Sequence, residues 1–141
     1  MEIKTTQEIN SKILEAIKRL IPQLTPTDTD ISIESLSELI NCGESELIIA
    51  WDKDEVVGAL SLVVFTIPTG KKAFIEDVVV DESYRGHGLG EKMVRKAIEL
   101  AKEKNVKRIE LSSRPSRIPA NKLYQKMGFK IRETNFYRLE L

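Results

Sequence analysis

Hydrophobic and polar positions in the first third of the chain follow a helical period. In residues 6–21, apolar side chains recur every three or four positions, which predicts an amphipathic helix that Pro22 ends. The residues of this apolar face are Ile9, Ile13, Leu14, Ile17, Leu20 and Ile21. After the polar segment TPTDTD, the pattern predicts a second helix over residues 31–40, ending at NCG with Gly43 as its cap.

The pattern then changes to that of β-strands. Two runs rich in branched and aromatic residues, ELIIAW and VVGALSLVVFTI, are separated by the polar turn DKDE, which predicts an antiparallel hairpin. The segment PTGKK indicates the next turn, and AFIEDVVVD indicates a third strand. A long helix is expected next, over residues 91–104, with charges on its outer side and one apolar stripe. That stripe comprises Leu89, Met93, Val94, Ala97 and Ala101.

The last part of the chain alternates between strand and helix patterns. KRIELSS favours a strand, and IPANKLYQKMG favours a short helix with Pro119 near its first turn and Gly128 at its end. FKIRETNFYRLEL is typical of two short strands about Asn135. The whole order predicts an α/β fold, with a mixed, mostly antiparallel twisted sheet flanked by helices and one parallel crossover through the long helix. No linker or repeat is visible, so residues 1–141 are expected to form a single domain.

Composition narrows the classes of function. The 141 residues are 41% hydrophobic, which is enough for a packed core. Lys and Arg equal Asp and Glu at 22 each, so charge gives no reason to expect nucleic acid or an anionic membrane as a partner. No apolar run approaches about 18 residues and no signal-peptide pattern is visible, so a cytoplasmic location is expected. Cys42 is the single cysteine, which fits a reducing compartment, and with only one His a metal site is not expected.

Three glycines stand at the predicted start of the long helix, in the stretch VVVDESYRGHGLG. The first backbone N–H groups of a helix have no partner within it, and the helix dipole favours negative charge there. Gly86, Gly88 and Gly90 would let the loop curl so that successive N–H groups point inward, and Arg85 can add a charge-assisted contact. The pattern indicates a phosphate-binding loop. The alternative is a tight strand-to-helix turn without a ligand.

Two common phosphate-binding loops do not fit this sequence. A mononucleotide-binding loop requires Gly-Lys-Ser/Thr, but Gly90 is followed by Glu91 and Lys92. A dinucleotide-binding loop requires Gly-x-Gly-x-x-Gly, and Glu91 occupies the place of its third glycine. Glu110, about 20 residues further on in a predicted strand, leaves a nicotinamide-binding Rossmann protein open as an alternative.

The pattern Arg/Gln-x-x-Gly-x-Gly/Ala is matched by Arg85, Gly88 and Gly90. In this the chain resembles the GNAT superfamily of N-acetyltransferases, whose loop of this form holds the pyrophosphate of acetyl-coenzyme A (acetyl-CoA). A second segment, NKLYQKMGF, is similar to the C-terminal motif of the same family. Its matching residues are Asn121, Leu123, Tyr124, Gly128 and Phe129. The resemblance covers residues 48–141, whereas the N-terminal third matches only in arrangement.

The resemblance implies that acetyl-CoA is the co-substrate and that no metal takes part. The pantetheine arm would pair with main-chain groups near Val78 and Val80, in the manner of an added strand. Family members expose this strand edge by a bulge, which the sequence does not reveal. A backbone N–H near Val78 or Val79 would hold the thioester oxygen as charge develops. The residues expected to contact the cofactor are Val78, Val79, Val80, Arg85, Gly86, His87, Gly88, Leu89, Gly90 and Asn121.

An amine attacks a thioester only as the free base. A lysine-like amine has a pKa of ~10.4, so at pH 7 its neutral form is disfavoured by roughly 4–5 kcal/mol and a base is needed. Glu76 and Asp77 precede the cofactor segment on one strand, and adjacent strand residues face opposite ways. Glu76 is the candidate base, with Asp77 or a water chain as alternatives. A structural carboxylate is the non-catalytic interpretation.

The leaving thiolate must be protonated. Because a thiol has a pKa near ~8.5, a phenol with a pKa near ~10 is a competent proton donor. The family motif places Tyr124 in this role. Asn121 lies three residues before Tyr124 in a predicted helix, hence on the same face, which would bring it to the cofactor. The alternative is that Tyr124 is a half-buried core aromatic packed with Leu123.

The motifs specify the acetyl donor rather than the acceptor. The family resemblance implies a small-molecule or peptide amine that attacks directly, and it makes the last strand a candidate homodimer interface. The segment IEDVVVDESYRG looks like the corresponding strand of glucosamine-6-phosphate N-acetyltransferases, so an aminosugar phosphate is one alternative acceptor. A non-catalytic acyl-CoA-binding module is another alternative. Arg114 and Arg117 either border the acceptor or cofactor phosphates or form a solvated basic loop.

Overall fold

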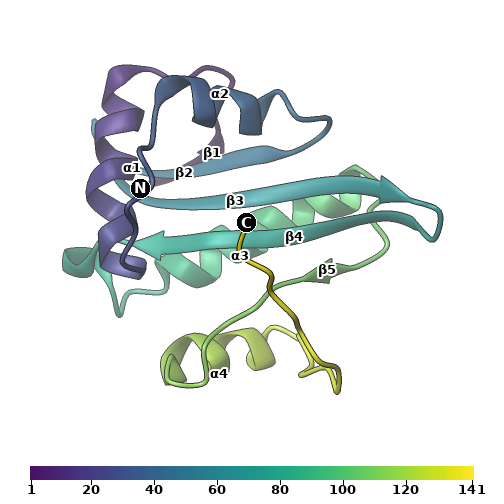
Figure 1. Cartoon of the computed structure of the whole chain (residues 1–141). Coiled ribbons are helices and arrows are strands. Elements are labelled where there is room, and N and C mark those ends of the chain that lie inside the picture. Colours follow the sequence, from purple (N-terminus) through teal and green to yellow (C-terminus); the bar gives the residue numbers. More distant parts are fainter. The chain divides into compact units, whose positions relative to one another are not determined.

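The structure, a computed structural model, describes residues 1–141 and divides into two compact units, Met1–Leu111 and Ser112–Leu141. The first, which we call the sheet unit, contains a five-stranded sheet in the order β1-β2-β3-β4-β5 (Figure 1). Its strands are β1 (Glu2–Thr5), β2 (Glu46–Asp52), β3 (Glu55–Ile67), β4 (Gly70–Val80) and β5 (Ile109–Glu110). Neighbouring strands are antiparallel except β4 and β5, which are parallel. The predicted mixed, mostly antiparallel α/β fold is confirmed, and the doubly wound parallel sheet of the Rossmann alternative is absent.

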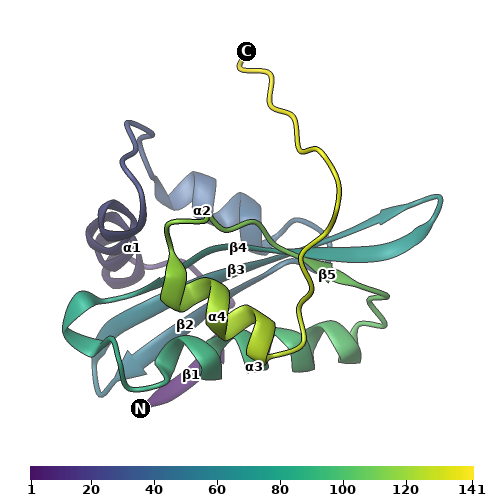
Figure 2. The same cartoon turned by 90° about the horizontal axis from the view of Figure 1, so that it is seen from below.

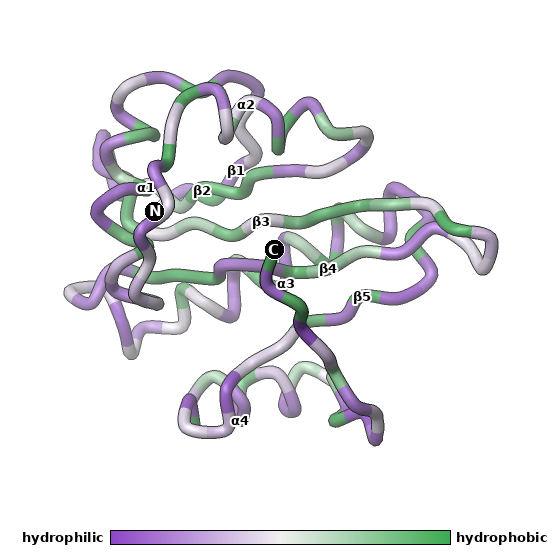
Figure 3. The backbone as a smooth tube through the Cα atoms, viewed as in Figure 1, coloured by the Kyte–Doolittle hydropathy of each residue, from purple (hydrophilic) through white to green (hydrophobic).

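Helices cover both faces of this sheet. Figure 2 shows α1 (Ser11–Leu24) and α2 (Ile33–Ile40) on one face and α3 (Leu89–Glu103) on the other. The side chains that α1 buries are Ile13, Ala16, Ile17 and Leu20, and they pack against Leu47, Ile49, Ala59 and Val79 of the sheet. The five residues that α3 buries are Leu89, Met93, Val94, Ala97 and Ala101, which confirms the predicted stripe. Hydrophobic residues accordingly concentrate along β2, β3 and β4 (Figure 3).

Close approach of α3 to the sheet depends on a glycine in β3. A Cβ added at Gly58 would lie 2.9 Å from the Met93 Sδ atom and 3.2 Å from the Val79 carbonyl oxygen. Real Cβ atoms do not approach that closely, so glycine lets the helix lie directly on the strand. This contact fixes the N-terminal half of α3 against the sheet, and with it the loop that leads into the helix.

Two predictions at the N-terminus are wrong. The helix begins at Ser11 rather than near residue 6, because Asn10 caps it and residues 2–5 form β1 instead, pairing with β2. The helix also continues through Pro22 to Leu24, with the Thr25 N–H bonded to the Ile21 carbonyl at 3.0 Å. A proline removes one backbone donor. In this last turn, Leu24 packs on the core cluster, and burial outweighs that loss.

The remaining elements of the sheet unit follow the predicted order. The β2–β3 hairpin and the third strand are confirmed, and α2 is two residues shorter at its start than predicted. Ser32 caps α2 by accepting the Ser35 N–H at 3.1 Å, while the Ser35 hydroxyl accepts the Ser32 N–H. The strand expected in KRIELSS is reduced to β5, residues Ile109–Glu110. No helix of the structure combines the length and apolar character needed to cross a membrane.

The second unit, Ser112–Leu141, contains one helix, α4 (Ile118–Lys126). Pro119 lies in its first turn, and Gly128 follows its end with φ 103°, as the sequence predicts. The two strands predicted about Asn135 are wrong, because residues 129–141 form neither helix nor strand. The alternating apolar residues of this segment, Ile131, Phe136, Tyr137, Leu139 and Leu141, are exposed. An alternating pattern becomes a strand only when a partner strand satisfies its backbone groups.

Candidate functional site

Strand β4 contains a β-bulge at the position of the candidate base. Between Glu76 and Val79, β4 has two residues, Asp77 and Val78, where β3 has only Leu60. Asp77 has φ 49°, in the left-handed region that residues with side chains rarely adopt. An extra residue of this kind bends a strand and interrupts its ladder of hydrogen bonds. The bulge implied by the family resemblance is therefore present.

The bulge places Glu76 on the face of the sheet that α1 and α2 cover. Glu76 lies opposite Ser61 and Val79 lies opposite Ala59, and these two β3 residues are two apart and share a face. Val79 and Ala59 pack against α1 in the core. In a regular strand, Glu76 and Val79 would face opposite ways. The irregularity thus brings a carboxylate to the same face as the buried end of β4.

The edge of β4 that faces away from β3 has no strand partner in the second half of the strand. Strand β5 pairs with β4 only at Ala73 and Phe74, so no strand of the sheet unit pairs with this edge from Ile75 to Val80. Unpaired N–H and C=O groups of an edge strand can pair with an extended ligand. The predicted cofactor residues Val78, Val79 and Val80 lie in this part of β4.

The glycine loop lies between β4 and α3. A single 3-10 turn, η1 (Glu82–Tyr84), precedes it, and Gly86 and Gly88 have φ of 82° and 79°. Gly88 is the N-cap of α3 and supplies no side-chain hydrogen bond, while Gly90 lies in the first turn. Cβ atoms added at Gly86 or Gly88 would meet nothing within 4 Å. The backbone around these glycines is therefore left-handed and open to a ligand.

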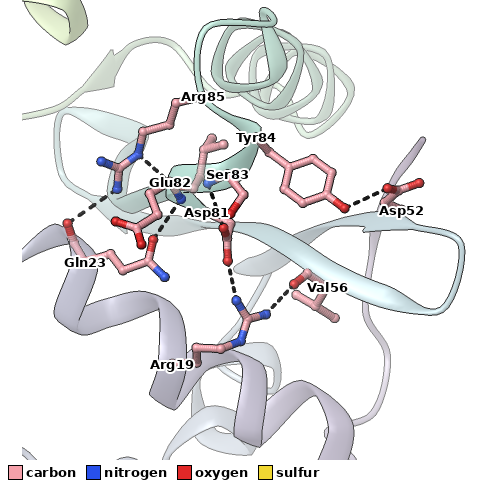
Figure 4. A network of polar contacts seen from close by, with 10 residues as sticks. Arg19, Gln23, Asp52, Val56, Asp81, Glu82, Ser83, Tyr84 and Arg85 are labelled. Atoms are coloured by element: carbon pink, nitrogen blue, oxygen red, sulfur yellow. Dashed lines mark hydrogen bonds and ion pairs between the residues drawn. The ribbon is translucent and has the colours of Figure 1, made fainter.

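The charged residues of the loop are exposed. The Arg85 Nε atom donates to the Val80 carbonyl oxygen at 3.0 Å, and its Nη2 atom lies 3.5 Å from the Gln23 carbonyl oxygen. Arg85 is thus folded back over the end of β4 and the end of α1 (Figure 4). His87 is exposed at the turn between the two glycines. No group of three or more His, Cys, Asp or Glu side chains is arranged to hold a metal ion.

The electrostatics of Glu76 suit a proton acceptor. Its side chain remains exposed, yet partial desolvation by the sheet raises the pKa of Glu76, and the neighbouring Asp77 charge raises it further. A carboxylate with a raised pKa is a stronger base. Asp77 is also exposed, and its strained backbone holds it at the bulge.

In the second unit, Asn121 and Tyr124 share one face of α4. The Asn121 amide nitrogen donates to the Arg114 and Arg117 carbonyl oxygens, at 2.9 and 2.8 Å, and so shapes the loop before the helix. Tyr124 is buried, and its ring meets the Phe129 ring edge-on, with centroids 6.0 Å apart. Burial raises the pKa of Tyr124, and the nearby Arg117 partly opposes that rise. The phenol therefore keeps its proton at neutral pH and is available as a donor.

Sequence reasoning missed the side chains of α1 that hold the segment between β4 and the glycine loop. Arg19 forms an ion pair with the buried Asp81, and its second nitrogen donates to the Val56 carbonyl oxygen at 2.8 Å (Figure 4). Gln23, one helical turn further, accepts the Glu82 N–H at 2.9 Å. In the sequence, Arg19 and Gln23 are ordinary polar positions on an amphipathic helix, and only the folded chain brings them to the loop.

The chain belongs to the acetyltransferase (GNAT) family, whose family model matches residues 14–129. It is 37% identical over 89 residues to a glucosamine 6-phosphate N-acetyltransferase of Trypanosoma brucei brucei, covering 61% of this chain and 58% of the relative. It is also 45% identical over 56 residues to a putative ribosomal protein bS18-alanine N-acetyltransferase of Bacillus subtilis, covering 40% of this chain and 37% of the relative. The chain thus matches about half the length of these curated relatives.

The fold has close counterparts among solved structures. A putative acetyltransferase from Agrobacterium tumefaciens superposes with a TM-score of 0.86 at 22% sequence identity, covering 99% of this chain and 100% of that one. At this level of identity the match establishes the fold. The family inferred from the glycine loop and the C-terminal motif is confirmed.

Proposed function

We propose that this chain is an acetyl-CoA-dependent N-acetyltransferase that moves an acetyl group to a primary amine by direct attack. One observation carries the proposal: a bulged stretch of β4, whose outer edge has no strand partner, leads through one 3-10 turn into a left-handed glycine loop at the start of α3. The edge suits an extended amide-containing arm, and the loop suits a diphosphate. Membership of the GNAT family supports this assignment of both features.

The main chain would hold the cofactor at two places. Amides around Gly86, Gly88 and Gly90 would bind the pyrophosphate, where the N-cap offers no competing side chain. Backbone groups of Val78 and Val80 would pair with the pantetheine arm, and a Val78 or Val79 N–H would stabilise the thioester oxygen. Arg85 would add a charge-assisted contact to a phosphate.

Proton transfers would be assigned to two side chains. Glu76 would take the proton from the attacking ammonium, directly or through water, because its raised pKa improves it as a base. The amine nitrogen then bonds to the thioester carbon, and the carbon–sulfur bond breaks. Tyr124 would give its phenolic proton to the leaving thiolate, and the second proton of the attacking nitrogen would return to the phenolate, directly or through water, so that an amide and free CoA thiol result.

The acceptor is proposed as a small-molecule or peptide amine. The T. brucei relative, named for an aminosugar phosphate, and the B. subtilis relative, named for an alanine of a ribosomal protein, support these two classes of amine. Of the two classes, an aminosugar phosphate is the more specific proposal, because the alignment with the T. brucei relative covers more of this chain than the alignment with the B. subtilis relative. Acceptors of both classes belong in the first assay.

The experiment is thiol release from acetyl-CoA with a panel of amines that includes glucosamine 6-phosphate, polyamines and short peptides. The wild-type protein should release thiol with at least one amine. Tyr124→Phe should lower kcat by about 10²- to 10⁴-fold, the range for loss of a general acid, and should leave CoA affinity unchanged. Tyr137→Phe, at an exposed tyrosine, serves as the matched control and should leave the rate unchanged.

Two results would contradict the proposal in different ways. Unchanged thiol release in Tyr124→Phe would remove the acid assignment and leave the enzyme class intact. Tight CoA binding without thiol release for any amine would instead favour a non-catalytic acyl-CoA-binding module.

A further inference from the structure

Two side chains of α1 reach the segment between β4 and the glycine loop. Arg19 and Gln23 are four residues apart, so they lie one turn apart on the same face of the helix. Arg19 pairs with Asp81, and Gln23 accepts the Glu82 N–H at 2.9 Å (Figure 4). The helix therefore holds two consecutive residues at the point where the chain leaves the sheet.

Asp81 is the centre of this contact. It is only 7% exposed, and its second carboxylate oxygen accepts the Ser83 N–H at 2.9 Å. Its own N–H donates to the Val57 carbonyl oxygen at 2.8 Å, so the residue is fixed to β3 as well. A buried carboxylate without its partners is costly. The position of Asp81 thus depends on the Arg19 guanidinium, which also bonds to the Val56 carbonyl oxygen at 2.8 Å.

A second tie holds the same segment from the sheet. The Tyr84 hydroxyl donates to the Asp52 carboxylate at 2.8 Å, in the turn region of the β2–β3 hairpin. Residues 81–84 are consequently held by α1 on one side and by β2 on the other. Gly86 and Gly88 that follow have no atom within 4 Å of an added Cβ. Their backbone is intrinsically permissive, so its direction is set by what holds its two ends, which are α3 downstream and the anchored residues 81–84 upstream.

We propose that Arg19, assisted by Gln23, is a positioning residue for the phosphate-binding loop. It holds residues 81–84 so that the amides after them point at the diphosphate before the ligand arrives, which lowers the ordering cost of binding. Neither side chain touches the cofactor in this scheme, because both act through Asp81 and Glu82. The inference rests on the proposed function, since it assumes that the loop binds the CoA diphosphate.

The test compares two ligands that share the pantetheine arm. CoA also carries the diphosphate and the 3′-phosphoadenosine beyond it, and pantetheine ends before both. Arg19→Met keeps much of the side-chain volume and removes the guanidinium. It should weaken CoA binding by about 10- to 100-fold, since misplacing a binding group by about an ångström costs a factor of this order. Pantetheine binding, measured by the same calorimetric titration, should change by less than about twofold, because pantetheine has no group that reaches the loop.

Matched variants separate positioning from charge. Lys18→Ala removes a neighbouring exposed cation of α1 that forms no hydrogen bond or ion pair, and it should leave both affinities unchanged. Arg19→Lys keeps a cation opposite Asp81 but loses the second donor, which bonds to the Val56 carbonyl oxygen, and it should restore part of the CoA affinity. Gln23→Leu removes only the acceptor for the Glu82 N–H and should cause a smaller loss than Arg19→Met.

Steady-state kinetics provides the readout that a merely structural role would not move. In Arg19→Met the KM for acetyl-CoA should rise by the factor seen for CoA affinity, while kcat at saturation stays within about twofold of wild type, because only binding is lost. Equal losses for CoA and pantetheine, or unchanged CoA affinity in a folded Arg19→Met protein, would overturn the inference. If that variant does not fold, Gln23→Leu decides, and unchanged CoA affinity there would overturn it. Failure of wild-type protein to bind CoA would instead refute the proposed function.

Discussion

Helices α1 and α3 begin in opposite ways. Helix α1 starts at Asn10, whose side-chain oxygen accepts the Ile13 N–H at 2.9 Å, and α2 is closed similarly by Ser32. Helix α3 starts at Gly88, which has no side chain and a left-handed φ of 79°. The first two helices satisfy their own terminal amides, whereas α3 leaves its start without a side-chain acceptor. Among the three helices of the sheet unit, the N-cap residue thus distinguishes the two that a side chain caps from the one whose start can bind an anion.

The largest effect should come from closing the open start of α3. Gly88→Val adds a branched side chain where the backbone is left-handed and the amides must stay accessible. CoA affinity, measured by calorimetry, should fall by about 100-fold, as expected when a binding group is displaced. Gly43→Val is the control, because Gly43 is also left-handed, at φ 57°, with nothing within 4 Å of an added Cβ.

Both glycine variants should lose similar stability, roughly 1–2 kcal/mol for a side chain in the left-handed region. Only Gly88→Val should lose CoA affinity. Equal CoA affinity in the two variants would show that the start of α3 does not bind the cofactor.

The next effect concerns the capped turn just before the glycine loop. The pKa of Asp81 is lowered, first by the hydrogen bond from the Ser83 N–H and further by Arg19, although burial opposes this. Asp81→Asn should therefore lower the free energy of unfolding at pH 7 by about 1–3 kcal/mol, the usual cost of disrupting a buried polar contact. Urea denaturation at a series of pH values provides the measurement.

The pH dependence has a defined sign. Because the folded-state pKa of Asp81 lies below the unfolded value of about 3.9, the stabilisation is fully present above that value. It is lost as pH falls through the folded-state pKa. The stability gap between wild type and Asp81→Asn should therefore narrow below about pH 4. A gap of constant size down to pH 2 would argue against an ionised Asp81 as its source.

A smaller effect is expected at the self-capped start of α1. Asn10→Ala removes the acceptor for the Ile13 N–H and should cost about 1 kcal/mol of unfolding free energy. CoA affinity should not change, since this cap serves the fold alone. Ser11→Ala, at the next exposed position, is the control and should change neither the unfolding free energy nor the CoA affinity. Thermal unfolding of wild type, Asn10→Ala and Ser11→Ala, with and without CoA, provides the measurement. Loss of CoA affinity in Asn10→Ala would contradict the claim that the cap of α1 serves the fold alone.

The smallest effect concerns the acidic residue in the first turn of α3. Glu91 pairs with Arg95 at 2.6 Å and also suits the positive end of the helix dipole. Glu91→Gln should lower unfolding free energy by about 0.3–1 kcal/mol. It should also tighten CoA binding by about twofold, because one negative charge near the expected diphosphate is removed. Weaker CoA binding would mean that Glu91 itself supports the ligand.

The sequence predicts those features that depend on local periodicity and backbone freedom. The buried stripe of α3, the β2–β3 hairpin and the glycine loop at the helix start all appear as predicted. Strand β1 was missed because residues 2–5 are too few to show a period. The end of α1 predicted at Pro22 was wrong, because packing of the last helical turn outweighs the backbone hydrogen bond that proline loses.

Features that require distant partners could not be predicted. The bulge at Asp77 depends on the register against β3, and alternation along β4 alone gives no sign of it. The strands expected after residue 128 do not form, because no partner strand pairs with this segment. Its backbone is irregular and its large apolar side chains are exposed. The Arg19–Asp81 ion pair joins residues 62 positions apart, and nothing local marks either one.

The central claim is that the amides at the start of α3 bind a diphosphate. Its most direct test is a calorimetric titration of folded wild-type protein with CoA and, separately, with pantetheine. If the claim holds, CoA will bind saturably at one site per chain, and pantetheine will bind much more weakly because it lacks the nucleotide part that carries the diphosphate. Equal affinity for the two ligands, or no saturable heat with CoA, would contradict it.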